Sequence, residues 1–363
     1  MQISAETVEF GQTKYNVVLY DDFEGLSSEL EKIQNVSKFI IITEKKVAKL
    51  YLDSVLLELE KLNQSVSVIF TKGKEKNKHI DRLKNVYNHL IELGADRKSV
   101  ILALGGGVIG DFAGFVAATF LRGIRFVQIP TTLLACVDSS VGGKVAVNAD
   151  KGKNMIGAFH QPELVFASLN SLETLEEKEW KCGLAEVLKH SLLTGGALFE
   201  TMKTATFEDV FNKNSLRIFI SESVKFKTSI VAEDERETGK RAILNLGHTL
   251  GHAIESLTNY KKYSHGEAVS IGLVLALILS KQKMGFKEET FLEIVKIMQN
   301  LKLPLKDESL SAKKLVEHMM HDKKTSNSQI KYILISHIGE ASWGNVLSEE
   351  DIVSAIKAQQ ALN

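Results

Sequence analysis

Cysteine is scarce in this chain, which contains only Cys136 and Cys182 among its 363 residues. Two cysteines in different parts of the chain cannot provide a disulfide framework, and their low number fits a reducing compartment. The first residues also lack the basic and apolar regions that make up a signal peptide. We therefore expect a cytoplasmic protein.

The chain also lacks an excess of charge of either sign, because 45 Lys and Arg residues balance 45 Asp and Glu residues. Proteins that bind nucleic acids or membrane surfaces usually carry a basic excess, so we expect neither kind of partner. The longest apolar run, residues 268–279, is too short to span a bilayer and predicts a buried helix instead. No internal repeat or low-complexity tract is present.

A chain of 363 residues exceeds what one hydrophobic core usually supports, so we expect two domains. In the first half, short apolar runs alternate with amphipathic segments such as 44–62 and 77–93. The predicted strands are residues 16–20, 38–43, 66–70, 99–104 and 125–129. Continuously apolar strands that alternate with helices predict a parallel sheet covered on both faces, as in an α/β, Rossmann-like domain.

The second half has a different character. From about residue 171 onward helical periodicity dominates, and only residues 329–335 look extended. We therefore expect an α/β domain over residues 1–170 and a mainly α-helical domain over residues 171–363.

Residues 105–110 match the spacing G-x-G-x-x-G between a predicted strand and a predicted helix. Glycines let the backbone approach a diphosphate, whose charge is favoured by the amino terminus of a helix. The acidic residue that usually binds a ribose about twenty residues later is missing, because residues 123–128 contain none. The pattern therefore favours a phosphate contact over a specific dinucleotide, and a tight turn without a ligand is the alternative.

A second glycine-rich segment, residues 130–157, carries Lys144, Lys153 and Asn154 beside glycines or short polar residues. This arrangement lets cations and an amide converge on a phosphate. Apolar residues are interleaved through the segment and predict partial burial instead of a solvated loop; they are Leu133, Leu134, Val137, Val141, Val145 and Val147.

A carboxylate and three histidines form the third candidate group. Glu186 and Lys189 lie three residues apart in a predicted helix and share one face. His248 and His252 lie four apart, a spacing that lets two imidazoles reach one ion, and His265 follows. Such N and O donors suit Zn²⁺ or a related divalent ion. Spacing alone nominates His248 with His252, and it cannot choose between His252 and His265; ordinary helix histidines are the alternative.

Taken together, these segments resemble the 3-dehydroquinate synthase family over nearly the whole chain. The motifs that carry the resemblance are residues 105–111, 130–134, 137–144, 152–154, 185–189, 244–252 and 265–267. The resemblance implies a lyase that converts 3-deoxy-D-arabino-heptulosonate 7-phosphate to 3-dehydroquinate and phosphate, in the shikimate pathway of aromatic amino acid biosynthesis. It implies transient oxidation by NAD at C5, phosphate elimination and intramolecular aldol closure.

The resemblance also implies roles for individual residues. One divalent metal, Zn²⁺ or Co²⁺, would be held by Glu186, His248 and His265, which frees His252 for acid–base catalysis. The other catalytic or substrate-contacting residues that it implies are Lys189, Asp138, Lys227, Arg241 and Asn245. The substrate-binding residues that it implies are Lys144, Asn154, one of Lys323 and Lys324, and Arg122, which the family donates from a neighbouring subunit and which implies a homodimer.

The resemblance implies that NAD lies along the glycine loop, against Gly105, Gly106, Gly107, Val108, Ile109, Gly110 and Asp111. Further implied contacts are Thr131, Thr132, Lys144, Lys153, Ser171, Leu172, Glu173 and Thr174. Glu44, Glu75 and Lys78 would replace the missing ribose acid, although residues 73–75 contain one residue more than the family pattern has there.

Three other functions compete with this interpretation. Another sugar phosphate cyclase would act on a substrate without a carboxylate. A polyol dehydrogenase would release NADH, and its family pattern has aspartate in place of Glu186. An inactive dinucleotide-binding regulator need not keep the metal ligands. Arg241 and Asn245 follow the synthase pattern, which differs at these positions from cyclases that use sedoheptulose 7-phosphate. A buried Arg241 beside a neutral substrate would also be costly. We therefore expect a phosphorylated sugar acid as substrate.

Overall fold

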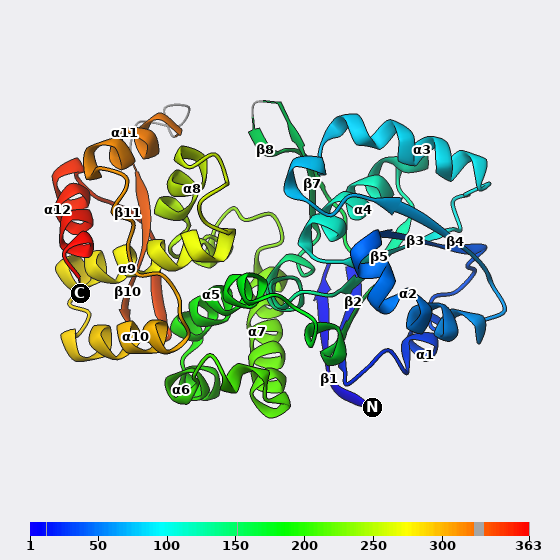
Figure 1. The fold of residues 1–363 in the computed structure, drawn as a ribbon, viewed down its shortest axis with the longest axis horizontal. Helices are drawn as coiled ribbons and strands as arrows, with labels where there is room; N and C mark the ends of the chain where they lie inside the picture. Colours follow the sequence, from blue (N-terminus) through cyan, green and yellow to red (C-terminus); the bar gives the residue numbers. More distant parts are fainter. Residues whose placement is uncertain (12, 151, 323–329, 363) are drawn as a thin grey trace. The chain divides into compact units, whose positions relative to one another are not determined.

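The computed structural model describes residues 1–11, 13–150, 152–322 and 330–362. The chain divides into two compact units (Figure 1). Unit 1 consists of Met1–Leu175 and Lys227–Glu235, and unit 2 consists of Glu176–Phe226 and Arg236–Asn363. The expected order, a parallel-sheet α/β region followed by a mainly helical region, is confirmed.

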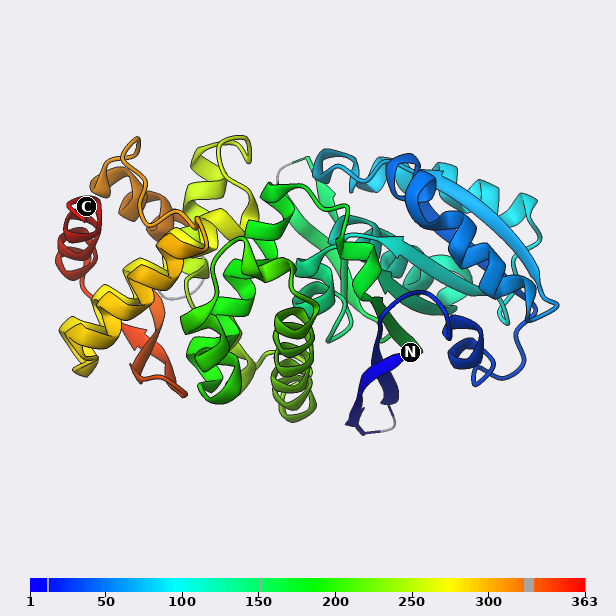
Figure 2. The same ribbon diagram turned by 60° about the horizontal axis from the view of Figure 1, so that its bottom comes forward.

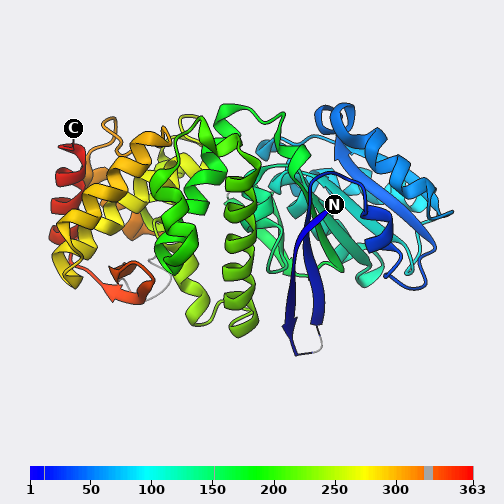
Figure 3. The same ribbon diagram turned by 90° about the horizontal axis from the view of Figure 1, so that it is seen from below.

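Unit 1 is built on a seven-stranded sheet with the order β1-β2-β9-β6-β5-β3-β4. Its strands are β1 (Gln2–Phe10), β2 (Thr13–Tyr20), β3 (Lys38–Glu44), β4 (Ser65–Thr71), β5 (Val100–Gly105), β6 (Arg125–Pro130) and β9 (Leu164–Ser168). All neighbours pair in parallel except β1, which pairs antiparallel with β2 and forms the hairpin at one edge of the sheet in Figure 3. The five predicted strands are confirmed, whereas β1 and β9 were not predicted.

Both faces of the sheet are covered by helices, which explains why its central strands are apolar throughout. In β3, Phe39 and Ile41 pack with α1 (Leu26–Leu30) and α2 (Lys45–Glu60). Ile40 and Ile42 point the opposite way and pack with α3 (Leu83–Glu92) and α4 (Gly107–Thr119). This alternation of side chains follows from the two-residue period of a strand.

The described residues of the glycine-rich segment 130–157, which exclude residue 151, pack against α4. The segment contains the π-helical turn η4 (Ala135–Ser139) and an antiparallel hairpin of β7 (Lys144–Ala149) and β8 (Gly152–Phe159). The predicted apolar residues are buried, except that Leu134 is only partly so. Short 3-10 turns complete unit 1: η1 (Glu75–Asn77), η2 (Ile80–Arg82), η3 (Phe120–Arg122) and η5 (Leu169–Leu172).

Unit 2 is mainly helical. Its helices are α5 (Glu177–Thr194), α6 (Gly196–Thr204), α7 (Lys213–Glu233, whose last turns belong to unit 1), α8 (His248–Leu257), α9 (His265–Met284), α10 (Glu288–Asn300), α11 (Ala312–Asp322) and α12 (Glu349–Gln360). Two 3-10 turns, η6 (Asp209–Phe211) and η7 (Lys240–Asn245), and an antiparallel pair, β10 (Lys331–His337) and β11 (Glu340–Val346), complete the unit. One extended segment was predicted there; β11 was not.

Helix α9 is the central element of unit 2, and Figure 2 shows it as the long yellow helix. It packs against α5, α8, α10, α12 and β10. Residues 268–280 are buried on every side, as the apolar run predicts, because a helix that is apolar all round belongs in a core. Ser264 begins the helix with a capping box to Glu267. Among the described residues, no helix is long and apolar enough to cross a membrane.

Candidate active site

The candidate metal ligands are brought together by glycines that let α9 approach its neighbours. A Cβ atom at Gly266 would lie only 2.3 Å from the carbonyl oxygen of Cys182 in α5. The Gly266 N–H donates a hydrogen bond to the Cys182 sulfur, and burial raises the pKa of this thiol to about 12, so it stays protonated. Glu186 follows Cys182 by one helical turn and therefore lies near His265, the first residue of α9.

The start of α8 is held against the same helix. A Cβ atom at Gly272 would lie 1.8 Å from the carbonyl oxygen of Gly247, and one at Gly251 would lie 3.2 Å from that of Ala268. Gly247 precedes α8 in a left-handed conformation, φ 80°, which suits glycine. These contacts place His248, the first residue of α8, beside the first turns of α9.

Glu186, His248 and His265 converge as a consequence, with their ligand atoms within 4.8 Å of one another. Oε1 of Glu186 lies 3.6 Å from Nε2 of His248 and 3.6 Å from Nε2 of His265. This oxygen is buried and makes no hydrogen bond among the described residues, and 3.6 Å is too long for one. Donor atoms on a tetrahedral Zn²⁺ lie roughly 3.4 Å apart, so the cluster has the donors and the spacing for a divalent ion.

The second ring nitrogen of each of these histidines has its own partner. Nδ1 of His248 lies 3.2 Å from the carbonyl oxygen of Leu246, and Nδ1 of His265 lies 3.1 Å from Oε2 of Glu255. The pKa of His248 lies well below its usual range. Burial is the largest cause, and the nearby charges of Lys189, His265 and His252 lower it further. His248 is therefore neutral near pH 7, the state in which imidazole binds a metal.

Lys189 and His252 lie beside this cluster, whereas Arg241 and Asn245 belong to η7. Lys189 is almost fully buried and forms an ion pair with Glu186. His252 is exposed, and its ring centroid lies 5.3 Å from that of His248. Arg241, in η7, is 2% exposed, and the amide of Asn245 donates a hydrogen bond to Glu237. Lys323 and Lys324 lie outside the described residues.

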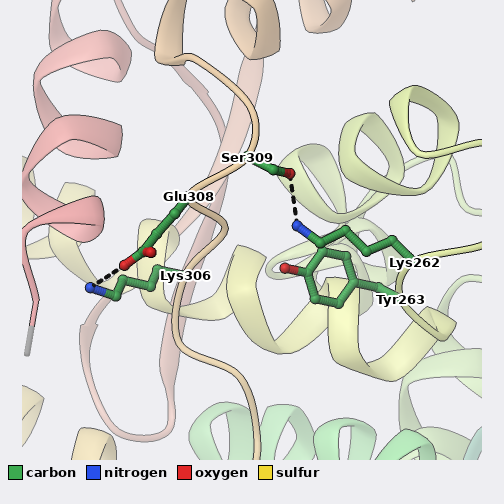
Figure 4. Close-up of a pocket in the computed structure, with 5 residues that line it drawn as sticks. All are labelled: Lys262, Tyr263, Lys306, Glu308 and Ser309. Carbon is green, nitrogen blue, oxygen red and sulfur yellow. Dashed lines mark hydrogen bonds and ion pairs between the residues drawn. The ribbon is translucent and has the colours of Figure 1, made fainter.

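The loop that leads into α9 is anchored by Asp307. This buried carboxylate accepts hydrogen bonds from Lys262 (2.6 Å) and Tyr263 (2.8 Å). Burial alone would raise the pKa of Asp307, but these hydrogen bonds and those of the following residues lower it overall. A surface hollow of about 480 Å³ lies beside the loop, and Figure 4 shows Lys262 pointing toward Ser309 across it. The anchor fixes the backbone two residues before His265.

In unit 1 the glycine loop joins β5 to α4. Gly106 precedes the first helical residue, so the loop presents the amino terminus of α4 at the carboxyl end of the sheet. Close packing also favours the glycines: a Cβ atom at Gly106 would lie 2.9 Å from the Thr132 side chain, and one at Gly107 would lie 2.8 Å from the Ser139 hydroxyl. Thr131, 3% exposed, donates its N–H to the carbonyl oxygen of Gly105.

Glu44 ends β3, the strand that pairs directly with β5. Its carboxylate accepts a hydrogen bond from the Gly73 N–H at 3.2 Å. Because parallel strands end at the same edge, Glu44 is one strand away from the glycine loop. An acid is thus present at the position where dinucleotide-binding sheets place their ribose ligand, although it precedes the loop in the sequence.

Buried Lys78 is the centre of a polar network in unit 1, whose other members are partly or fully exposed. Its ammonium group lies 2.7 Å from Oδ2 of Asp111 and 2.6 Å from Oδ1 of Asn154, and its side chain is 3% exposed. The Glu75 carboxylate lies 3.6 Å away and accepts a hydrogen bond from Asn148. Burial raises the pKa of Asp111 against the lowering effect of the Lys78 charge.

The remaining predicted residues of unit 1 have different settings. Lys227, 6% exposed, donates a hydrogen bond of 2.8 Å to Oδ1 of Asp138. Lys144 is exposed at the start of β7, and Lys153 is partly buried in β8. The segment 171–174 is held by Tyr51, whose hydroxyl donates to the carbonyl oxygen of Ser171.

Comparison with known proteins agrees with this arrangement. Residues 68–182 match the 3-dehydroquinate synthase N-terminal family, and residues 183–325 match the 3-dehydroquinate synthase C-terminal family. The chain belongs to the 3-dehydroquinate synthase family. It is 54% identical over 347 residues to 3-dehydroquinate synthase of Leptospira interrogans, and the match covers 95% of each chain. It is 42% identical over 354 residues to 3-dehydroquinate synthase of Thermoanaerobacter pseudethanolicus, and that match covers 97% of this chain and 99% of the relative.

Solved structures share the fold. A 2-deoxy-scyllo-inosose synthase complexed with carbaglucose-6-phosphate, NAD⁺ and Co²⁺ matches with a TM-score of 0.86 and 26% identity, over 98% of this chain and 99% of that one. A 2-epi-5-epi-valiolone synthase from Streptomyces hygroscopicus with NAD⁺ and Zn²⁺ bound matches in fold with a TM-score of 0.87 and 23% identity, over 97% and 98% of the two chains. The expected family, fold and kind of enzyme are therefore confirmed.

Two features were not found from the sequence. Glu255 was not assigned a role, although it lies seven residues after His248 and so on the same face of α8. The partners of Lys78 come from α4 and β8, and no local pattern connects these segments.

We predict that Lys78→Met destabilises the protein at neutral pH by on the order of 3 kcal/mol, because it leaves the Asp111 carboxylate, only 19% exposed, without its cation. A carboxyl whose folded pKa is raised takes up a proton on folding, so its contribution to stability is greatest below the unfolded pKa and falls as pH rises through the folded pKa. Urea unfolding at pH 5 and pH 8 should therefore show the larger loss at pH 8.

Lys76→Met, at an exposed position two residues earlier, is the matched control. Adding Asp111→Asn to Lys78→Met should restore much of the stability at pH 8. An equal loss at both pH values, or no recovery in the double variant, would show that the pair does not carry this energy.

Proposed function

We propose that this chain catalyses the conversion of 3-deoxy-D-arabino-heptulosonate 7-phosphate to 3-dehydroquinate and phosphate in the shikimate pathway, with NAD and one divalent metal, Zn²⁺ or Co²⁺. The observation that carries the proposal is the buried Glu186 oxygen that faces two imidazole nitrogens at 3.6 Å. It occurs in a chain that is 54% identical to a 3-dehydroquinate synthase over 95% of its length.

In this proposal Glu186, His248 and His265 hold the metal, and NAD binds along the loop from Gly105 to Asp111. The first-turn N–H groups of α4 favour a diphosphate, and Glu44 at the end of β3 is placed to accept hydrogen bonds from a ribose. Additional proposed NAD contacts are Glu75, Lys78, Thr131, Thr132, Lys144, Lys153, Ser171, Leu172, Glu173 and Thr174. Lys78 already binds Asp111 and Asn154, so it also fixes the shape of this region.

When bound, NAD supplies a reversible hydride acceptor for C5, and the metal supplies Lewis acidity at the C5 hydroxyl oxygen. The ketone formed at C5 makes the proton on C6 acidic, which allows phosphate to leave from C7. His252 on α8 is exposed and lies beside the candidate metal ligand His248. It is the proposed proton-transfer group. Buried Lys189, which is paired with Glu186, and partly buried Asp138, which is paired with Lys227, would orient the reacting hydroxyl groups.

The substrate has two anionic ends, and we assign different residues to each. Lys144, Asn154 and one of Lys323 and Lys324 would bind the phosphate end. Arg241 would bind the carboxylate with its planar fork of N–H donors, supported by Asn245.

We further propose a cytoplasmic homodimer in which Arg122 of one subunit reaches the phosphate site of the other. Arg122 is exposed, and its backbone is left-handed, φ 70°, directly after Leu121 at φ 50°. Two consecutive non-glycine residues in the left-handed backbone region cost free energy. Such strain is common at functional sites, and it supports a functional role for the exposed Arg122 side chain. We expect neither nucleic acid nor membrane partners.

The overall reaction gives one test of this proposal. With the heptulosonate substrate, NAD and Zn²⁺, the chain should release phosphate without accumulating NADH, because the hydride taken from C5 is returned before the product leaves. Phosphate release and NADH absorbance are measured together, and metal-free enzyme is the control. Stoichiometric NADH would indicate a polyol dehydrogenase, and absence of phosphate release would contradict the synthase assignment.

The assignment of Arg241 to the substrate carboxylate gives a separate test. Arg241→Ala should lower kcat/KM for the heptulosonate by about 10- to 100-fold, the loss of a charge-assisted hydrogen bond, and should affect sedoheptulose 7-phosphate much less because that sugar lacks the acid. Lys240→Ala, at the exposed neighbouring position, is the control. An equal loss of kcat/KM for both substrates would show that Arg241 does not bind a carboxylate. Faster turnover of sedoheptulose 7-phosphate than of the heptulosonate by the unaltered chain would show the same.

A further inference from the structure

The imidazole of His265 lies between two buried carboxylates. Its Nε2 atom is 3.6 Å from Oε1 of Glu186, and its Nδ1 atom is 3.1 Å from Oε2 of Glu255. Glu255 is 4% exposed and belongs to α8, on the face that also carries His248 and His252. The two contacts differ in kind, because 3.1 Å is a hydrogen-bond distance and 3.6 Å is not.

This difference determines which nitrogen of His265 is available to a metal. A neutral imidazole has one N–H donor and one lone pair. If the proton is on Nδ1, it is donated to the Glu255 carboxylate, and the lone pair on Nε2 then points to the side where Glu186 and Nε2 of His248 lie. The opposite tautomer would place a lone pair against a carboxylate oxygen, which is repulsive.

We propose that Glu255 is a positioning residue that fixes the tautomer and the ring orientation of His265 as a metal ligand; this inference rests on the proposed function. His248 is oriented in the same way, but by the backbone carbonyl of Leu246, which no substitution removes. His265 instead depends on a side chain. A carboxylate behind a ligating histidine also raises the basicity of the ring and so strengthens the bond to the metal.

The rival arrangement makes Glu255 a ligand itself. The ligand atoms of His252, Glu255 and His265 also lie within 4.8 Å of one another. In that arrangement His265 would present Nδ1 to the metal, and His252 would be essential for binding. In the proposed arrangement His252 is dispensable for binding, so a His252 variant separates the two.

The test measures the metal affinity of the full-length chain independently of turnover. Metal-free protein competes with a chromophoric chelator for Zn²⁺, and the visible spectrum of the Co²⁺ form reports the coordination. Glu255→Ala should weaken Zn²⁺ binding by about 10- to 100-fold, while one Co²⁺ still binds with the spectrum of the unaltered protein. Glu255→Gln should lose less, because its amide oxygen can still accept the Nδ1–H.

His252→Ala should bind Zn²⁺ as tightly as the unaltered chain, whereas His265→Ala should lose the site. Unchanged affinity in both Glu255 variants, or a loss in His252→Ala that equals the loss in Glu255→Ala, would overturn the inference. The metal-free unfolding midpoint checks that each variant folds, and Glu255→Gln carries the test if Glu255→Ala does not. Failure of the unaltered chain to bind one metal ion would instead overturn the proposed function, and the inference with it.

Discussion

A Cβ atom on Gly272 would overlap the carbonyl oxygen of Gly247 at 1.8 Å, and one on Gly266 would overlap that of Cys182 at 2.3 Å. Helix α9 can therefore approach α5 and the start of α8 only because it carries glycine at these two positions. The approach places Glu186 and His248 against His265, each from a different helix. The polar cluster is thus a consequence of backbone packing. The Glu186 carboxylate at its centre is fully buried and needs positive charge to offset its desolvation, part of which Lys189 supplies.

In unit 1 the order of the strands places the candidate cofactor-binding residues, as the glycine contacts of α9 place the candidate metal ligands in unit 2. Pairing of β3 with β5 places Glu44 beside the glycine loop, and the turn after β4 places Lys78 against Asp111. In both units a buried charge is held by residues that are far apart in the sequence. Such networks are sensitive to the loss of one partner, because the remaining charge is then buried alone.

Local patterns were sufficient for much of the fold. Strands β3 and β5 were predicted because buried parallel strands are continuous apolar runs, and α9 because it is apolar on all sides. Strands β8 and β11 were not predicted, since most of their side chains are at least partly exposed and show no clear period. The family resemblance supplied the site residues, whereas spacing alone could not choose between His252 and His265. That choice depends on the tertiary contact of α8 with α9, as does the contact of Glu255 with His265. The position of Glu44 depends instead on the pairing of β3 with β5.

We propose that the glycine contacts of α9 assemble a metal site from Glu186, His248 and His265. Anomalous diffraction at the zinc edge from crystals of the Zn²⁺-loaded chain tests it most directly. We expect one peak at about 2.0–2.2 Å from a Glu186 oxygen and from Nε2 of both histidines. A peak bonded to His252, Glu255 and Nδ1 of His265, or to none of these residues, would contradict it.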